Sequence, residues 1–192
     1  KTVLKKIFSV VFNKKVIAVI LVLVVVSQVI TGVVLGSAVV KPDSFAESSK
    51  AENIIRFPLS EPAYVKWLEG KAEKVMMKNS DGKNLSGITL SDNATSHSYI
   101  IMCHPLTSGA LDMASYAYHF YDLGFNVIIP DSRGYGDDEY SKISFGYFEK
   151  NDILDWVNAI VKKDDKAKIF LFGVGMGGST VLMASELNLP HN

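Results

Sequence analysis

Three loops carry most of the residues that could bind a ligand or take part in a reaction, and each follows an apolar run. They are CHPLTS at 103–108, PDSRGYG at 130–136 and GVGMGG at 173–178. In open α/β sheets, ligands gather beyond the carboxyl ends of the strands, where such loops lie. We therefore expect a site built from the histidine, aspartate and arginine of the first two loops and the closely spaced glycines of the third.

Several other chemistries do not fit the residues present. Cys103 and His104 are neighbours on an expected strand, so their side chains point to opposite faces and cannot form a catalytic dyad. The chain has one cysteine, which rules out an internal disulfide and a cysteine-based zinc site. The histidines show no metal-binding spacing. We expect no metal and no other cofactor.

The sequence supplies strands and helices in alternation to position these loops. A hairpin is expected over Val75–Leu90, with its turn at Ser80-Asp81-Gly82. Continuous apolar runs, typical of strands buried on both faces, lie at 98–103, 126–129 and 168–172. Helices are expected at 110–123, 149–163 and 177–187. This order predicts an α/β fold with a mostly parallel sheet and an antiparallel N-terminal hairpin.

Taken together, the three loops resemble the α/β-hydrolase superfamily, in particular bacterial membrane-anchored hydrolases of the serine aminopeptidase or esterase kind. The family pattern is a strand ending in His-Gly, then Asp-x-Arg-Gly-x-Gly, then Gly-x-Ser-x-Gly-Gly. Here the corresponding residues are His104-Pro105, Asp131 to Gly136, and Gly173 to Gly178. The resemblance runs from about Val75 to Asn192, roughly the first half of the family's domain, and implies a truncated α/β-hydrolase fold.

This resemblance implies serine-dependent hydrolysis of ester, amide or peptide bonds, but Gly175 stands at the nucleophile position. Glycine has no oxygen, so no acyl-enzyme can form there, and the family's acid and histidine are expected beyond position 192. The chain as written is predicted to be inactive. The oxyanion donors carry over as the backbone N–H groups of Leu106 and Met176. Pro105 replaces a glycine and is expected to reshape the loop that presents Leu106.

The other motif residues are expected to shape the elbow and its loops. In the family, the counterpart of His104 steadies its loop. Arg133 is expected to tie its turn together by hydrogen bonds, with Asp131 in the same turn. Gly173, Gly177 and Gly178 fit a cramped bend, in which a side chain would strike the neighbouring strand or helix.

Two alternatives remain open for this site. The domain could be a pseudoenzyme that binds a small ester or peptide ligand at the membrane surface without turning it over. As a minor alternative, Gly173, Gly175 and Gly178 also spell G-x-G-x-x-G after a strand, which is the dinucleotide fingerprint. That fingerprint also requires an acidic residue about 20 positions later, at the end of the next strand; this position lies beyond Asn192, and Glu186 is too early and in an expected helix.

A membrane partner is indicated by residues 16–40, which contain no charge. At 1.5 Å per residue such a helix spans roughly 37 Å, enough to cross the hydrocarbon core of a bilayer. Five lysines and no acidic residue precede it. The positive-inside rule therefore predicts a single-pass protein of the cell membrane, with the N-terminus in the cytoplasm and the hydrolase-like domain outside. A cleaved signal peptide, with small residues at 36–38, is the alternative.

The chain therefore divides into a basic cytoplasmic N-terminus at 1–15, a transmembrane helix at 16–40, a linker at 41–61 and a partial α/β-hydrolase domain at 62–192. Because it starts with lysine and stops soon after an expected helix, we expect a fragment of a longer gene product. Lysine plus arginine equals aspartate plus glutamate, with 20 of each. This balance gives no reason to expect a nucleic-acid partner.

Overall fold

The computed structural model describes residues 13–40, 61–91, 95–106, 108–137, 139–140 and 142–190. The chain falls into two compact units, Lys1–Val39 and Val40–Asn192, and each is described separately. Most of the predicted basic N-terminus at 1–15 and of the predicted linker at 41–61 lies outside the described residues.

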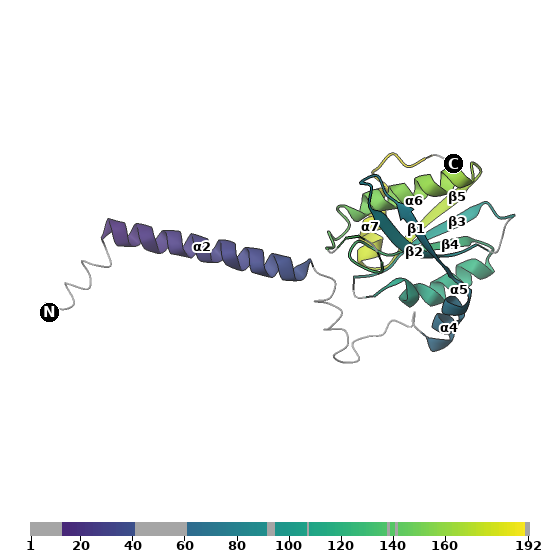
Figure 1. The fold of residues 1–192 in the computed structure, drawn as a ribbon, viewed down its shortest axis with the longest axis horizontal. Coiled ribbons are helices and arrows are strands. Elements are labelled where there is room, and N and C mark those ends of the chain that lie inside the picture. Colours follow the sequence, from purple (N-terminus) through teal and green to yellow (C-terminus); the bar gives the residue numbers. More distant parts are fainter. Residues whose placement is uncertain are drawn as a thin grey trace. The chain divides into compact units, whose positions relative to one another are not determined.

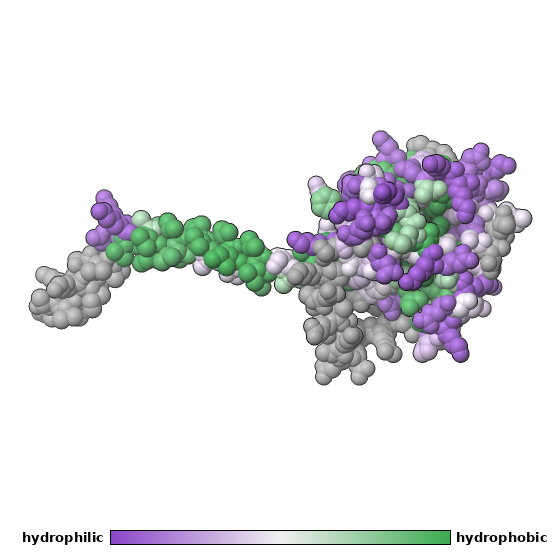
Figure 2. All heavy atoms as spheres, in the orientation of Figure 1, coloured by the Kyte–Doolittle hydropathy of each residue, from purple (hydrophilic) through white to green (hydrophobic). Residues whose placement is uncertain are grey.

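The N-terminal unit contains a single described helix, α2, which runs from Lys14 to Val39. Its mean hydropathy is 2.8, and none of its most apolar stretch is buried within the protein. Apolar side chains cover most of the face of α2 that Figure 2 shows, after hydrophilic residues at its start. Since lipid leaves every backbone group to be satisfied within the segment, a helix is the form that such a sequence takes in a bilayer. α2 could therefore be a membrane anchor, or a signal sequence, which has the same properties near an N-terminus.

The C-terminal unit is built on a five-stranded sheet with the strand order β1-β2-β4-β3-β5. Its strands are β1 (Glu73–Lys78), β2 (Asn84–Leu90), β3 (Ser98–Cys103), β4 (Asn126–Pro130) and β5 (Lys168–Gly173). β2 runs antiparallel to β1 and to β4, whereas β3 is parallel to β4 and β5. The predicted hairpin and parallel sheet are thus present, and the carboxyl ends of β3, β4 and β5 share one edge (Figure 1).

Helices cover both faces of this sheet (Figure 1), and β3 and β4 are largely buried as expected. The expectation of a buried strand at 168–172 is wrong, because β5 is the last strand of the described sheet and Phe170 is 53% exposed. One core joins the sheet to α4 (Pro62–Lys71), the 3-10 turn η2 (Ala110–Met113) and α5 (Ala114–Asp122). The other joins it to α6 (Glu149–Lys163) and α7 (Met176–Ala184). Residues alternate between the two along β3, with Ile100 and Met102 in the first core and Ile101 and Cys103 in the second.

Two features of the helices differ from the expectations. The helix expected at 110–123 begins with the 3-10 turn η2, and the carboxylate of Asp112 accepts the Gly109 N–H at 2.9 Å. α4 was not expected. Its signal was Pro62 in the first turn, where a missing N–H costs nothing, and its buried Leu68 packs against the sheet.

Candidate active site

The bend between β5 and α7 carries the residue that the sequence places at the nucleophile position. Gly175 lies between the last residue of β5, Gly173, and the first residue of α7, Met176. Its dihedral angles are φ 56° and ψ −119°. Residues with side chains rarely adopt a positive φ, and a sharp strand-to-helix turn in such a strained conformation is the framework that exposes a nucleophile above a sheet.

The glycines on either side of this bend are required by close backbone contacts. A Cβ atom at Gly177 would lie 2.1 Å from the carbonyl oxygen of Cys103, and one at Gly173 would lie 2.4 Å from the backbone of Gly177. Gly178 is less restricted, since its Cβ would lie 3.2 Å from the nearest atom, the oxygen of Gly173. α7 therefore packs against the ends of β3 and β5 more closely than any side chain would permit.

Position 175 has more room for a side chain than its neighbours have. A Cβ there would lie 3.3 Å from the Cβ of Pro105 and 3.9 Å from its Cα, and no other described residue beyond its two chain neighbours comes within 4 Å. The space that a nucleophilic side chain would enter thus opens toward the loop after β3. Pro105, the residue that departs from the family pattern, forms its near wall.

The loop after β3 and the start of α7 lie side by side, as the oxyanion prediction requires. Val174 N–H donates to the carbonyl of Cys103 at 3.2 Å, which ties the two segments together. Within the described part of the chain, neither the Leu106 nor the Met176 backbone N–H has a hydrogen-bond acceptor. Both remain predicted oxyanion donors.

His104 is fully buried and both of its ring nitrogens are engaged. The backbone N–H of Ser132 donates to Nε2 at 3.0 Å, so Nε2 carries no proton and Nδ1–H donates to the carbonyl of Pro105 at 2.9 Å. Burial lowers the pKa of this imidazole, although the Pro105 carbonyl and nearby carboxylates oppose the shift. His104 links the loops after β3 and β4 and has no free nitrogen to act as a base.

Asp131 holds the start of the loop after β4 against β2. Its Oδ2 accepts the hydroxyl proton of Ser86 at 2.7 Å, and its backbone N–H donates to the Ser86 carbonyl at 3.0 Å. Gly136, at φ 61°, folds back onto this carboxylate, where a Cβ would lie 2.1 Å from Oδ2. Asp131 therefore shapes the loop and is not presented to a substrate.

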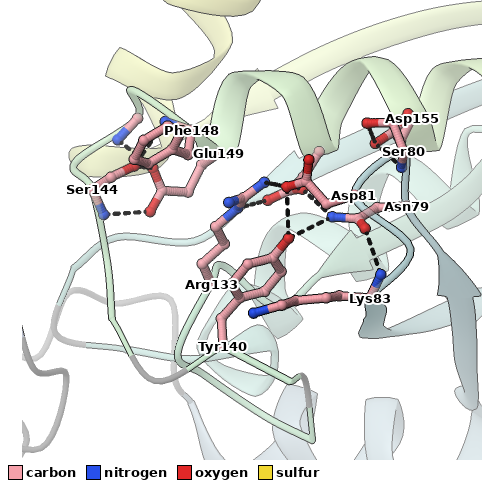
Figure 3. Close-up of polar contacts among 12 residues, drawn as sticks. Asn79, Ser80, Asp81, Lys83, Arg133, Tyr140, Ser144, Phe148, Glu149 and Asp155 are labelled. Carbon is pink, nitrogen blue, oxygen red and sulfur yellow. Dashed lines mark hydrogen bonds and ion pairs between the residues drawn. The ribbon is translucent and has the colours of Figure 1, made fainter.

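Arg133 forms a buried bidentate pair with Asp152 of α6 (Figure 3). Nε donates to one carboxylate oxygen at 2.5 Å and Nη2 to the other at 2.8 Å. Burial acts to lower the pKa of Arg133, but hydrogen bonds and charge from Asp152 outweigh it and raise the pKa. The guanidinium also lies over the Tyr140 ring, 4.1 Å from its centroid. A planar fork is needed for this double contact, so Arg133 ties its turn to α6.

Two polar clusters around α6 could not be found from the motifs. Asn79, in the β1–β2 turn, donates to both Asp152 at 3.1 Å and the Tyr140 hydroxyl at 2.9 Å (Figure 3). At the start of α6, the buried Glu149 carboxylate accepts the Ser144 N–H at 2.6 Å and the Gly146 N–H at 2.8 Å. The only sequence signal was an acidic residue in the first turn of a helix, where N–H groups are unpaired.

Cys103 is buried, and burial raises its thiol pKa to about 12. A thiol with so high a pKa carries almost no thiolate at neutral pH and is a poor nucleophile. This agrees with the expectation of a small hydrophobic residue in the core.

The strand order, the antiparallel β2 and the bend after β5 define an α/β-hydrolase fold. In agreement, the family model for the α/β-hydrolase fold matches residues 99–192. An uncharacterized protein of Bacillus subtilis, YqkD, is 32% identical over 103 residues, which are 53% of this chain and 33% of YqkD.

Solved structures show the same fold. An esterase of Pyrococcus furiosus, Pf2001, aligns with a TM-score of 0.58 and 25% identity over 65% of this chain and 49% of the esterase. XC6422 of Xanthomonas campestris, described as a serine hydrolase without a lid, aligns with a TM-score of 0.53 and 18% identity over 60% of this chain and 56% of its own. The chain spans a third of YqkD and about half of these two proteins.

Proposed function

We propose that the chain is the membrane-anchored part of an α/β-hydrolase-family protein whose family reaction is serine-dependent hydrolysis of ester, amide or peptide bonds. In this proposal it resembles the serine aminopeptidase or esterase kind, and it is inactive as written because glycine replaces the serine at position 175. The site keeps the shape to receive a small ester or peptide group next to the Leu106 and Met176 N–H groups.

The observation that carries the proposal is the geometry of Gly175. A positive φ, a position directly beyond the carboxyl end of the parallel strand β5 and the two glycines forced by backbone contact are together the features of a nucleophile elbow. A hydrolase in this mechanism needs an oxygen at the tip, a base to remove its proton and an oxyanion site. Of these, the proposal assigns the oxyanion site to the backbone N–H groups of Leu106 and Met176.

The lack of a base near the bend supports the proposed inactivity. Both nitrogens of His104 are engaged. His97 pairs with Asp164 before β3, at the opposite end of the sheet. Ser179, one turn into α7, turns its hydroxyl back toward the Gly175 carbonyl at 3.5 Å. None of these described side chains can replace the missing serine and its base.

Labelling with a fluorophosphonate probe tests this proposal. The purified chain is expected to show no covalent label. The full-length gene product carrying Gly175→Ser is expected to gain label, because only the attacking hydroxyl is restored. Strong labelling of the unaltered chain would refute the proposal, and so would a folded Gly175→Ser protein, full length, that stays unlabelled.

We also propose that α2 is an uncleaved anchor in the cell membrane, with the N-terminus in the cytoplasm and the C-terminal unit outside. The buried Cys103 makes a direct test possible, since it is a silent background for thiol reagents. Lys162→Cys, on the exposed side of α6, should react with a membrane-impermeant maleimide on intact cells. Ser9→Cys should react only after lysis. The opposite pattern, or loss of the first forty residues from the mature protein, would contradict the proposal.

A further inference from the structure

A second cavity lies at the end of the sheet opposite Gly175. It has a volume of about 720 Å³ and opens between α6 and the β1–β2–β4 part of the sheet. Tyr99 and Asn126, at the amino ends of β3 and β4, line it, whereas Gly175 follows the carboxyl end of β5. A volume of this size lies in the range of small-molecule sites. The cavity does not depend on the proposed function of the elbow.

The walls of this cavity are apolar in the middle. Val75 and Met77 of β1, Ile128 of β4, and Trp156 and Ile160 of α6 line it. Apolar surface framed by hydrophilic residues is visible near β1 and α6 (Figure 2). A ligand that enters here therefore gains by burying an apolar body.

Trp156 has an unmet hydrogen-bonding need at this wall. It is 4% exposed, and its indole Nε1–H is the one buried side-chain polar group of the described residues with no partner. An unpaired buried donor costs about 1–3 kcal/mol. Because that nitrogen is itself buried, a ligand in the cavity would contact the indole ring of Trp156 and not its N–H group.

The charges at the rim specify the ends of the ligand. Lys74 is paired with Asp137 at 2.9 Å, and Asp164 with His97 at 2.7 Å. This leaves Glu73 on β1 and Lys163 on α6 as the charged lining residues without an ion pair among the described residues. They stand on opposite walls and have opposite signs. A ligand with a cationic end, an apolar body and an anionic end would meet both.

From this arrangement we infer that the cavity binds a small zwitterion with an apolar body, such as a dipeptide with apolar side chains. The ammonium group pairs with Glu73 and the carboxylate with Lys163. The apolar side chains lie against Val75, Ile128 and the indole ring of Trp156. A free dipeptide with apolar side chains has these three features in this order.

The two tryptophans allow a direct binding assay. Trp67 packs between Tyr118 and Tyr121 on the other face of the sheet, so Trp67→Phe leaves Trp156 as the only tryptophan. Leucyl-leucine is titrated into this variant of the 192-residue chain in lipid nanodiscs, and binding is followed by Trp156 fluorescence and, in parallel, by calorimetry. Saturable binding is expected. Its absence in both measurements would overturn the inference.

Matched variants test each part of the ligand. Glu73→Gln should weaken the binding of leucyl-leucine roughly two- to fivefold. It should leave the binding of N-acetyl-leucyl-leucine unchanged, because that analogue has no ammonium group. Lys163→Gln should weaken the binding of both peptides by a similar factor, because both carry the carboxylate. Lys162→Gln, just outside the cavity, should weaken the binding of neither peptide. If the uncharged N-acetyl-leucyl-leucine amide bound as tightly as leucyl-leucine, the inference that the cavity recognises a zwitterion would be refuted.

Blocking the cavity provides the last control. Ala159 lines the cavity from an exposed position on α6, so Ala159→Phe should abolish binding without unfolding the domain. Asn158→Phe places the same ring on the same helix outside the cavity and should bind normally. Loss of binding in both variants, or in neither, would show that the ligand sits elsewhere.

Discussion

Replacing Gly177 by alanine tests the packing of the elbow most sharply. The new methyl group would lie 2.1 Å from the carbonyl oxygen of Cys103 and 2.5 Å from its carbonyl carbon. Both are backbone atoms of a buried strand, which no side-chain rotation can move aside. α7 must therefore shift away from β3 by about 1 Å or more to restore ordinary contact.

The cost of this shift follows from the contacts that it disturbs. Overpacking in a rigid core costs up to about 3 kcal/mol. The hydrogen bond from Val174 N–H to the Cys103 carbonyl, 3.2 Å long, is lost or weakened at about 1 kcal/mol. Alanine offsets about 1 kcal/mol of this loss in stability, because it is a better helix former than glycine. The net expected loss is about 3 kcal/mol, a large part of the stability of an ordinary domain.

The assay uses Cys103 itself as the reporter. Its buried thiol reacts with a maleimide only when the C-terminal unit opens, so its reactivity against denaturant gives an unfolding midpoint that is independent of α2. Gly70→Ala is the matched control. Outside its own helix, no described residue comes within 4 Å of a Cβ at this position, so the change should raise the free energy of unfolding by roughly 0.5–1 kcal/mol. A Gly177→Ala protein within about 0.5 kcal/mol of the unaltered chain would refute the close packing.

Three further predictions concern the buried polar groups. Arg133→Lys loses the bidentate contact to Asp152 and should lower the free energy of unfolding by about 2–4 kcal/mol in chemical denaturation. The control Lys150→Arg, at the ion pair with the exposed Glu186, should change the free energy of unfolding little. Because burial holds the pKa of His104 below its usual 6.5, the unfolded chain binds the proton more tightly. Stability should then be intact above pH 6.5 and fall below it, by at most about 1.4 kcal/mol per pH unit, and His104→Gln should flatten this part of the pH profile. Cys103 should resist iodoacetamide at pH 8 in the folded protein and react in denaturant, since its pKa is raised to about 12; rapid alkylation of the folded chain would contradict the burial.

The sheet could be predicted from the sequence because its strands have recognisable patterns of apolar residues. The run SYIIMC is apolar on both faces, as a strand covered on both sides by helices requires, whereas KIFLF lies at the edge of the described sheet with Phe170 exposed. The cramped bend was predictable for a similar reason, since only glycine fits where Gly173 and Gly177 meet backbone atoms. In the buried strand and in the bend alike, one local requirement restricts which residue types can stand there.

The polar contacts and the cavity that could not be predicted from the sequence depend on residues that are distant along the chain. Asn79 and Asp152 are 73 residues apart and meet only after the sheet has formed. The same is true of the cavity beside Trp156, whose walls come from β1, β2, β4 and α6. α4, which was not expected, packs through the fully buried Leu68 and the partly buried Tyr64, Val65 and Trp67. Tertiary packing decides such elements more than local propensity does.

Mass spectrometry of the fluorophosphonate-treated full-length Gly175→Ser protein tests the central claim most directly. The account predicts one phosphonate adduct, on the peptide that spans the bend between β5 and α7 and at the substituted position. The matched Ser179→Ala change in the same protein should leave that adduct in place. An adduct on any other serine, or one lost with Ser179, would mean that the attacking hydroxyl belongs elsewhere and that this bend is not the elbow of a hydrolase.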